Sequence, residues 1–282
     1  MISLNPLARL VTPDGKTGLE AISRTTHLGI GAHQDDLEFM AFHGILTCYD
    51  RTDRWFGGVT ITDGRGSSRA GQFKDWTDDQ IAAERIREQE AAAIIGQYSF
   101  IAQLGFSSAT VRDVQQSAVR DDLRRILEAS RPEVVYLHNL ADKHDTHVGC
   151  TLRCIEAIRQ MPKADRPKMV YGCEVWRDLD WLVDSEKIAM PISARPELAQ
   201  ALNEVFATQI AGGKRYDLAV LGRRTANATF SNAHSTDQES AMQWAMDLTP
   251  LIQDDSLDPV AYTVGFIDRL KADVTARIRQ SL

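Results

Sequence analysis

Three side chains that can bind a metal or move a proton follow directly after an apolar stretch near the start of the chain. In the segment HLGIGAHQDDLEFM, residues 27–40, the apolar run ends in His33 and in the adjacent carboxylates of Asp35 and Asp36. Neighbouring carboxylates repel each other unless a cation or a proton lies between them. A bound metal ion is therefore the first hypothesis for this stretch.

A second group of polar side chains follows another apolar stretch, in the segment HNLADKHDTH of residues 138–147. His144 and His147 are three positions apart, which places both imidazoles on one side of a helix start. With His33 and His138, four of the seven histidines fall at the ends of two predicted strands. In open α/β sheets ligands bind at the carboxyl ends of the strands, so we expect the two groups to share one edge.

A histidine, a carboxylate and a second histidine form a ligand set that suits Zn²⁺ and leaves a fourth position for water. One aspartate of the pair can bind the metal while its neighbour accepts a proton from that water, and a remaining histidine can donate to the leaving group or the oxyanion. Each motif alone has an ordinary explanation, because an aspartate after a strand is a favoured helix N-cap. Their coincidence after two strands favours a metal site.

Apolar stretches of strand type alternate with amphipathic helical stretches, a pattern typical of a parallel sheet wrapped by helices. The predicted strands are residues 27–32, 55–62, 100–106, 133–138 and 169–176. The predicted helices are residues 78–96, which open on a T-x-x-Q capping box, 116–129, 147–159, 196–210 and 258–282. We expect an α/β protein of one domain, residues 1–282, with residues 160–282 as a smaller and looser region packed on the rest.

Composition narrows the function classes. The chain of 282 residues is 43% hydrophobic and 25% charged, which is ordinary for a globular protein, and its formal charge of −7 argues against a nucleic-acid partner. The N-terminus lacks a signal peptide pattern and no stretch is long and apolar enough for a membrane span, so we expect a cytoplasmic protein with four reduced cysteines. The glycines of GIGAHQ do not make a dinucleotide fingerprint, because Gln34 stands where its third glycine is required.

The motifs resemble those of the PIG-L/LmbE-like family of metal-dependent de-N-acetylases. The family's AHPDD motif with its following acidic residue stands here as AHQDDLE, residues 32–38, and its HPDH motif stands as HDTH, residues 144–147. Three weaker matches are TDG at residues 62–64, RIREQEAAAIIG at residues 85–96 and LGF at residues 104–106. The resemblance covers about the first 160 residues.

This resemblance implies a Rossmann-like, mostly parallel sheet with a zinc site at its carboxyl edge, with Fe²⁺ as the alternative metal. The implied metal ligands are His33, Asp36 and His147, the implied general base is Asp35, and His144 would stabilise the tetrahedral intermediate or protonate the departing amine. The implied reaction hydrolyses the acetamide of a small amino-sugar conjugate and releases acetate.

Two departures from the family pattern affect this reading. Gln34 replaces the usual proline, and Thr146 stands where the family has an aspartate beside the second histidine. We expect Asp145 or Asp142 to orient His144 instead, because a carboxylate behind a site histidine can matter about 10- to 100-fold for affinity or activity.

Candidate substrate contacts are less distinctive. Arg65 and Arg69 could hold a phosphate or carboxylate of the substrate, with an exposed loop as the equal alternative. Trp176 could present its face to a sugar ring, and His43 could reach the site, although core packing is the commoner fate of both residue types. A basic group of Lys214, Arg215, Arg223 and Arg224 could bind an anion, form an oligomer contact or be a solvated face.

Two other functions stay open at this stage. The protein could be a metal hydrolase of another amide or ester bond, including a phosphoester, or a catalytically silent sugar-binding relative. Two metal ions about 3.5 to 4 Å apart would favour phosphoester chemistry, whereas one metal ion would favour amide hydrolysis.

Overall fold

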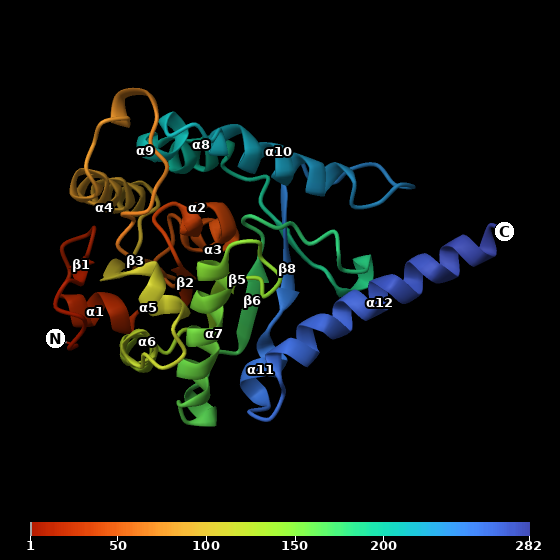
Figure 1. Cartoon of the computed structure of the whole chain (residues 1–282), viewed down its shortest axis with the longest axis horizontal. Helices are drawn as coiled ribbons and strands as arrows, with labels where there is room; N and C mark the ends of the chain where they lie inside the picture. The colour runs from red at the N-terminus through yellow and green to blue at the C-terminus, as the bar shows by residue number, and fades with distance from the viewer. Residues whose placement is uncertain (1) are drawn as a thin grey trace.

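One sheet of eight strands forms the centre of the protein, in a computed structural model that describes residues 2–282 (Figure 1). The strands are β1 (Arg9–Val11), β2 (His27–Gly31), β3 (Phe56–Thr62), β4 (Phe100–Phe106), β5 (Val134–His138), β6 (Met169–Cys173), β7 (Ile188–Pro191) and β8 (Met242–Asp247). Their order across the sheet is β1-β4-β3-β2-β5-β6-β8-β7. The predicted α/β, Rossmann-like fold is confirmed.

The five central strands are parallel, and their order creates a switch point. From β2 the chain proceeds through β3 to β4 on one side, whereas β5 pairs with the other side of β2 and is followed outward by β6. The crevice outside the carboxyl ends of β2 and β5 therefore lies where the winding direction reverses, which is where open α/β sheets bind ligands. Strands β1, β7 and β8 add antiparallel edges.

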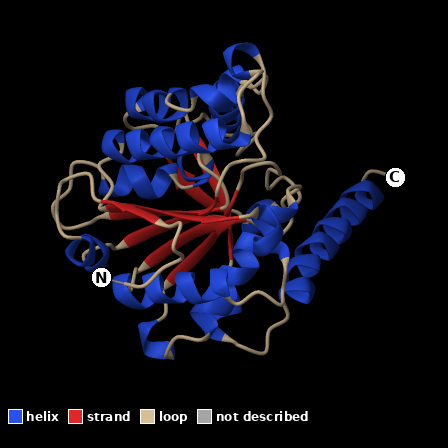
Figure 2. Cartoon of the chain, turned by 60° about the vertical axis from the view of Figure 1, so that its left-hand side comes forward, coloured by secondary structure: helices blue, strands red, loops and turns tan. Residues whose placement is uncertain are grey.

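Helices cover both faces of the sheet, which explains why β2 and β3 are buried along their whole length (Figure 2). One layer contains α1 (Gly18–Ser23), α5 (Ser108–Arg112), α6 (Ala118–Ser130), α7 (Asp145–Arg159) and α11 (Thr249–Gln253). The other layer contains α2 (Asp36–Met40), α3 (Phe42–Cys48), α4 (Asp78–Ile95), α8 (Pro196–Glu204), α9 (Ala207–Ala211) and α10 (Tyr216–Thr229).

The side chains of β2 show how the two layers are built. Leu28 and Ile30 point into the core beneath one helical layer, and the alternate positions, Gly29 and Gly31, face the other layer. A Cβ at Gly29 would lie 2.8 Å from a Phe56 ring carbon. The glycines of the GIG segment therefore let α2 and neighbouring side chains approach the sheet closely.

The second half of the chain differs in part from the expectation. Strands β6, β7 and β8 extend the same sheet as β2 to β5. The edge strands β1 and β7, and β8 beside β7, were not predicted. The expected helix over residues 196–210 is interrupted between α8 and α9, and α10 was not predicted. The last helix, α12 (Pro259–Gln280), packs at its start and then projects from the body (Figure 1).

Three smaller predictions have definite outcomes. The capping box at the start of α4 is present, because the Gln80 N–H donates to Thr77 Oγ1 and the Thr77 N–H donates to Gln80 Oε1. All four cysteines are buried and free. Within residues 2–282, none of the helices combines the length and the apolar character that a membrane crossing requires.

Candidate active site

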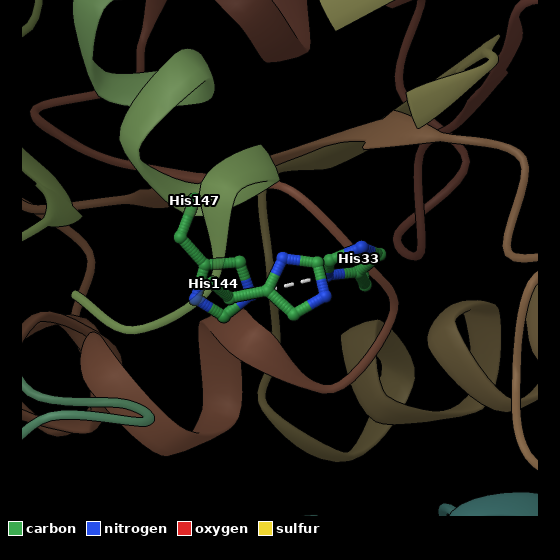
Figure 3. Close-up of side chains that lie close together, drawn as sticks. All are labelled: His33, His144 and His147. Carbon is green, nitrogen blue, oxygen red and sulfur yellow. Dashed lines mark hydrogen bonds between the residues drawn. The ribbon is translucent and has the colours of Figure 1, made fainter. Parts of the chain in front are cut away.

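Three predicted metal ligands meet at the switch point. His33 and Asp36 follow β2, and His147 lies in the first turn of α7, which follows β5. The Nδ1 atom of His33 lies 3.1 Å from His147 Nε2 and 3.2 Å from Asp36 Oδ2, and His147 Nε2 lies 3.4 Å from the same Asp36 oxygen. Figure 3 shows the rings of His33, His144 and His147 gathered at this point.

The size of this triangle fits a bound metal ion. A tetrahedral Zn²⁺ with bonds of about 2.0–2.2 Å separates its ligand atoms by about 3.3–3.6 Å, close to the three distances observed here. Burial lowers the pKa of His147 to about 4, so at neutral pH the ring is uncharged and its nitrogen can bind a cation. Burial raises the pKa of Asp36, but the imidazoles of His147 and His138 outweigh it and hold the carboxyl ionised.

Asp142 supports the ligand His147 from behind. Its Oδ1 lies 3.4 Å from His147 Nδ1 and accepts the backbone N–H of His144 at 2.9 Å. A carboxylate on the far nitrogen of a ligating histidine fixes the ring and makes the ligating nitrogen more basic. Asp142 therefore contacts His147 rather than the His144 ring, the ring that we expected Asp142 or Asp145 to orient.

The His144 ring is oriented by the backbone instead. Its side chain caps α7, with Nδ1 accepting the N–H of Thr146 at 3.2 Å. Because Nδ1 is an acceptor, the proton of the neutral ring is on Nε2, and burial together with the nearby His33 lowers the pKa so that the neutral form dominates. His144 can therefore act as a hydrogen-bond donor in the cavity described below, which its side chain lines. The contact that orients its ring uses only the backbone N–H of Thr146, not the Thr146 side chain.

Asp35 is held in a strained conformation beside the ligands. Its φ is 99°, a region that residues other than glycine rarely adopt, and its N–H donates to Gln89 Oε1 at 3.2 Å. Burial raises the pKa of the Asp35 carboxyl well above the usual range, while Arg85 Nη2, 3.6 Å away, opposes this and Asp36 adds to it. A carboxylate with a raised pKa is suited to accept a proton.

His138 is the buried histidine behind the metal ligands. Its ring stacks on His147 with centroids 3.8 Å apart, and its Nε2 lies 3.4 Å from Asp36 Oδ2. By distance alone, two groups could hold a metal ion: one of His33, His144 and His147, and one of Asp36, His138 and His147. The Ala32 N–H already donates to His138 Nε2 at 3.0 Å, which occupies the lone pair that a metal would need. The facing donor atoms of the predicted ligands His33, Asp36 and His147 lie 3.1 to 3.4 Å from one another, so this set fits a metal ion.

Close packing places these residues. A Cβ at Gly31 would lie 2.9 Å from the Asp36 Cβ, so only glycine lets α2 bring this ligand to the sheet. Gly64, in the TDG segment, has a φ of +71°, and a Cβ there would meet Gln34 Oε1 at 2.6 Å. Gln34 in turn donates from Nε2 to the Thr62 carbonyl and to the side chain of Gln103, so this replacement of the family proline ties the turn to β3 and β4.

The metal group opens into a cavity of about 610 Å³ between the two helical layers. Aromatic side chains line it, namely Phe39, Trp176 and Tyr216. Trp176 is 37% exposed, and its ring centroid lies 6.4 Å from that of His144 and 6.1 Å from that of Tyr216. The predicted substrate contact Trp176 therefore lines the cavity beside His144.

Other predicted substrate contacts lie elsewhere. Arg65 pairs with Asp79 and Arg69 pairs with Asp78, and neither arginine lines the cavity. His43 does not line the cavity either, and its Nδ1 contacts the Tyr136 hydroxyl at 2.9 Å.

The sequence reasoning gave no role to several residues that line or support the cavity. They are Arg85, Gln89, Arg112, Glu174 and Tyr216. The RIREQEAAAIIG match contains two of them, Arg85 and Gln89, and was the signal that connected α4 with the site.

The fold and the side chains of His33, Asp36 and His147 define the class of this protein. It is a Rossmann-like α/β protein with a His–Asp–His group at the switch point that fits a metal ion. Residues 28–158 match the PIG-L family model, described as GlcNAc-PI de-N-acetylase. This match confirms the resemblance to the PIG-L/LmbE-like family that the AHQDDLE and HDTH motifs carry. The comparison with curated protein sequences gave no match.

Solved structures share the fold. A conserved protein from Thermus thermophilus has a TM-score of 0.59 at 18% identity, covering 83% of this chain and 99% of that chain. A 4-carboxy-2-hydroxymuconate hydratase from Pseudomonas putida has a TM-score of 0.58 at 17% identity, covering 79% and 96%. N,N'-diacetylchitobiose deacetylase from Pyrococcus horikoshii has a TM-score of 0.58 at 17% identity, covering 84% and 85%. At these identities the likeness shows the fold alone.

Proposed function

We propose that the protein is a metal-dependent hydrolase that removes the N-acetyl group from an amino sugar or an N-acetylglucosaminide conjugate and releases acetate. The observation that carries the proposal is the triangle of ligand atoms from His33, Asp36 and His147, with Asp35 and His144 lining the same cavity. The family match to a GlcNAc-PI de-N-acetylase supports the same reaction.

The side chains have complementary roles in this reaction. A zinc ion, or Fe²⁺ as the alternative, held by the three ligands would supply Lewis acidity toward the acetamide oxygen and toward water. Asp35 takes a proton from the attacking water, whose oxygen bonds to the acetamide carbon. His144 donates its Nε2–H to the developing oxyanion. The C–N bond then breaks, and the departing amine takes the proton from the Asp35 carboxyl group.

The test is a measurement of amine and acetate release from N-acetylglucosaminides. Protein loaded with Zn²⁺ or Fe²⁺ should release both products in equal amounts, and a chelator should stop the release. Loading each metal separately identifies the more active one. If phosphate is released from phosphoesters instead, the alternative hydrolase is correct, and sugar binding without turnover would indicate the silent relative.

Substitutions at the base and at one ligand separate their roles. Asp35→Ala should keep the metal and lose nearly all turnover, by about 10³-fold or more, because the proton acceptor is gone. His147→Ala should lose both metal and turnover. Metal content by elemental analysis and acetate release measured together check this, and normal turnover in Asp35→Ala would remove the proposed base.

Several further predictions accompany this proposal. We propose that the substrate is a small amino-sugar conjugate and that the protein has no nucleic-acid or membrane partner. We also propose a cytoplasmic location and assembly as a homo-oligomer.

A further inference from the structure

Helix α12 carries exposed apolar side chains outside the candidate active site. The helix spans Pro259–Gln280, packs on the body at its start and projects beyond it, and none of its residues lines the cavity (Figure 1). Five of its β-branched side chains are 45 to 68% exposed: Val260, Val264, Ile267, Val274 and Ile278. Large apolar side chains that gather on one exposed surface mark an interaction site.

These five side chains follow the spacing of a coiled-coil seam. Their positions advance by four, three, seven and four residues, and the step of seven contains one more seam position, which is Lys271. Side chains with this repeat form one continuous stripe along an α-helix, which a second helix can cover. We call these six positions the α12 seam.

A different face of α12 holds the helix to the body. Phe266 is buried, and its ring meets those of Trp181 and Tyr262 edge to face, with centroids 6.5 and 5.1 Å apart. Arg269 pairs with Glu186. Successive residues of an α-helix turn by about 100°, which places the α12 seam roughly 120° around the helix from Phe266. A partner can therefore cover the seam while the helix keeps its place on the body.

The α12 seam is complementary to itself when two copies of the helix run antiparallel. Val260 of one copy then lies opposite Ile278 of the other, and Val264 lies opposite Val274. Both pairs have the same midpoint in the sequence, so one two-fold axis relates the two copies along the whole seam. Apolar side chains thus cover apolar side chains at both ends of the pair.

The charges near the middle of the seam favour the antiparallel orientation. A parallel pair in register would place Lys271 opposite the same lysine of the other copy, and the two charges would repel. In the antiparallel pair, Lys271 lies opposite Ile267 and only one residue, about 1.5 Å along the axis, from Asp268 of the second copy. Within residues 2–282, the ion pairs of α12 leave both Lys271 and Asp268 unpaired. Both charges are therefore available to an antiparallel partner.

A lipid surface fits the α12 seam less well than a second copy does. Helices that lie on lipid surfaces keep lysine and arginine on the polar face, whereas Lys271 interrupts the apolar stripe itself. The acyl region of a bilayer offers this lysine no carboxylate. A second copy of α12 supplies both the apolar side chains and, in Asp268, the acidic partner of Lys271.

We propose that the α12 seam pairs with the seam of a second copy of this chain, in antiparallel orientation, and so forms a two-fold symmetric dimer. The pairing spans residues 260–278, about 28 Å of helix, and only the seam and its flanks contact the partner. Because a standard interface uses about 20–30 residues per side, this smaller one should give a dimer that dissociates on dilution, with a Kd in the micromolar range. The inference names an interface for the proposed homo-oligomer and does not rest on the deacetylase reaction.

Sedimentation velocity of the full chain from about 1 to 100 µM tests the pairing. We expect the mass to rise from that of one chain, 31.4 kDa, toward twice this value. Val274→Asp should weaken dimerisation by at least about 10-fold, because each dimer then buries two unpaired carboxylates. The matched control is Ala276→Asp, which adds the same charge at an exposed position on the side of α12 away from the seam and should keep the parental Kd. Circular dichroism checks that both variants keep their helix content.

Disulfide cross-linking tests the orientation. A mixture of the Val264→Cys and Val274→Cys proteins should form disulfide-linked dimers under oxidation, because these positions lie opposite each other in the antiparallel pair. Each variant alone should form few, since its new thiol faces a valine and the four native cysteines are buried.

The outcomes separate the possible occupants of the seam. A parent protein that stays a monomer at every concentration would overturn the proposal, and so would parental dimerisation in Val274→Asp. Cross-linking of each cysteine variant alone, without an increase in the mixture, would overturn the antiparallel orientation. Monomers that bind vesicles of phosphatidylcholine and phosphatidylserine, in the parent and in Ala276→Asp but not in Val274→Asp, would assign the seam to a lipid surface instead.

Discussion

The side chain that would take the proton is held by its backbone. Asp35 has a φ of 99°, and its N–H is satisfied by Gln89 Oε1, which reaches across from α4. The same glutamine donates from Nε2 to Glu38 at 2.8 Å, so its orientation is fixed from the other end. Gln89 therefore acts as a positioning residue for Asp35 without contacting the substrate.

Gln89→Leu should lower kcat by about 10- to 100-fold with little change in KM, because the Asp35 N–H loses its acceptor and the carboxylate loses its orientation. Metal content should stay at that of the parent protein, since no ligand contacts Gln89. Steady-state kinetics with elemental analysis check both. A variant with parental kcat would show that Asp35 keeps its conformation without this contact.

Gly31→Ala should weaken metal binding, because its Cβ would lie 2.9 Å from the Asp36 Cβ and would push α2 from the sheet. We expect a loss of metal affinity of about 10-fold or more together with about 1–3 kcal/mol of stability. Gly222→Ala on α10 is the matched control, because its added Cβ meets no atom within 4 Å. Competition with a metal indicator measures the affinity, and equal affinity in both variants would contradict the packing argument.

At this scale the sequence could predict that His33, Asp36 and His147 would lie together, because they follow strands whose carboxyl ends share one edge of the sheet. It could not predict the supporting contacts of Gln89 and Asp142. These depend on the distance between α4 and the turn after β2 and on the ring orientation of His147, which no local pattern records. Arg65 and Arg69 were predicted as substrate contacts because they follow the TDG segment. In the structure they pair instead with carboxylates at the start of α4.

At the scale of elements, the start of β2 carries a buried histidine that the proposed reaction does not use. Burial lowers the pKa of His27 to about 4 from an ordinary value of 6.5, with the charges of His43 and Arg54 adding to this. The unfolded chain therefore binds more protons than the folded protein between these two values. The contribution of His27 to stability is complete above pH 6.5 and is lost as the pH falls toward 4.

In His27→Gln, the free energy of unfolding should fall less on acidification than in the parent protein, by on the order of 3 kcal/mol, because glutamine does not titrate. Denaturant unfolding of the metal-free protein at pH 7 and pH 4.5 measures this. Burial also lowers the pKa of His43 and His147, so these histidines add to the pH dependence of both proteins. The quantity to compare is therefore the difference between variant and parent in how far the free energy of unfolding falls from pH 7 to pH 4.5. Parallel curves for both proteins would show that His27 is not the group responsible.

The central strands could be predicted because they are buried on both faces and read as short apolar runs between helices. The antiparallel edge strands could not, since β1 has three residues and β7 has four, and neither is continuously buried. Helix α10 was missed for a related reason: residues such as Leu218 and Ala219 are exposed, so its apolar pattern is weak. That helix supplies Tyr216, Arg223 and Arg224 to the cavity, which is why the cavity wall was less predictable than the metal group.

At the scale of the whole molecule, the cavity lies between parts of the chain that have different relations to the family. The metal group comes from within residues 28–158, which match the family model, whereas α10 and Trp176 come from outside that range. The same fold occurs in a hydratase and in a deacetylase. The predicted metal group therefore comes from the part that matches the family model, whereas much of the cavity wall comes from the rest of the chain.

The position of the metal group across the switch point has a consequence for assembly. His33 and His147 are 114 positions apart in sequence and belong to the two oppositely wound halves of the sheet. A nascent chain cannot present both imidazoles to one ion until β2 and β5 have paired, so binding of the proposed metal would follow the pairing of these strands. A bound ion would then cross-link the two halves of the sheet, and its removal should weaken the contact between β2 and β5 before either half unfolds.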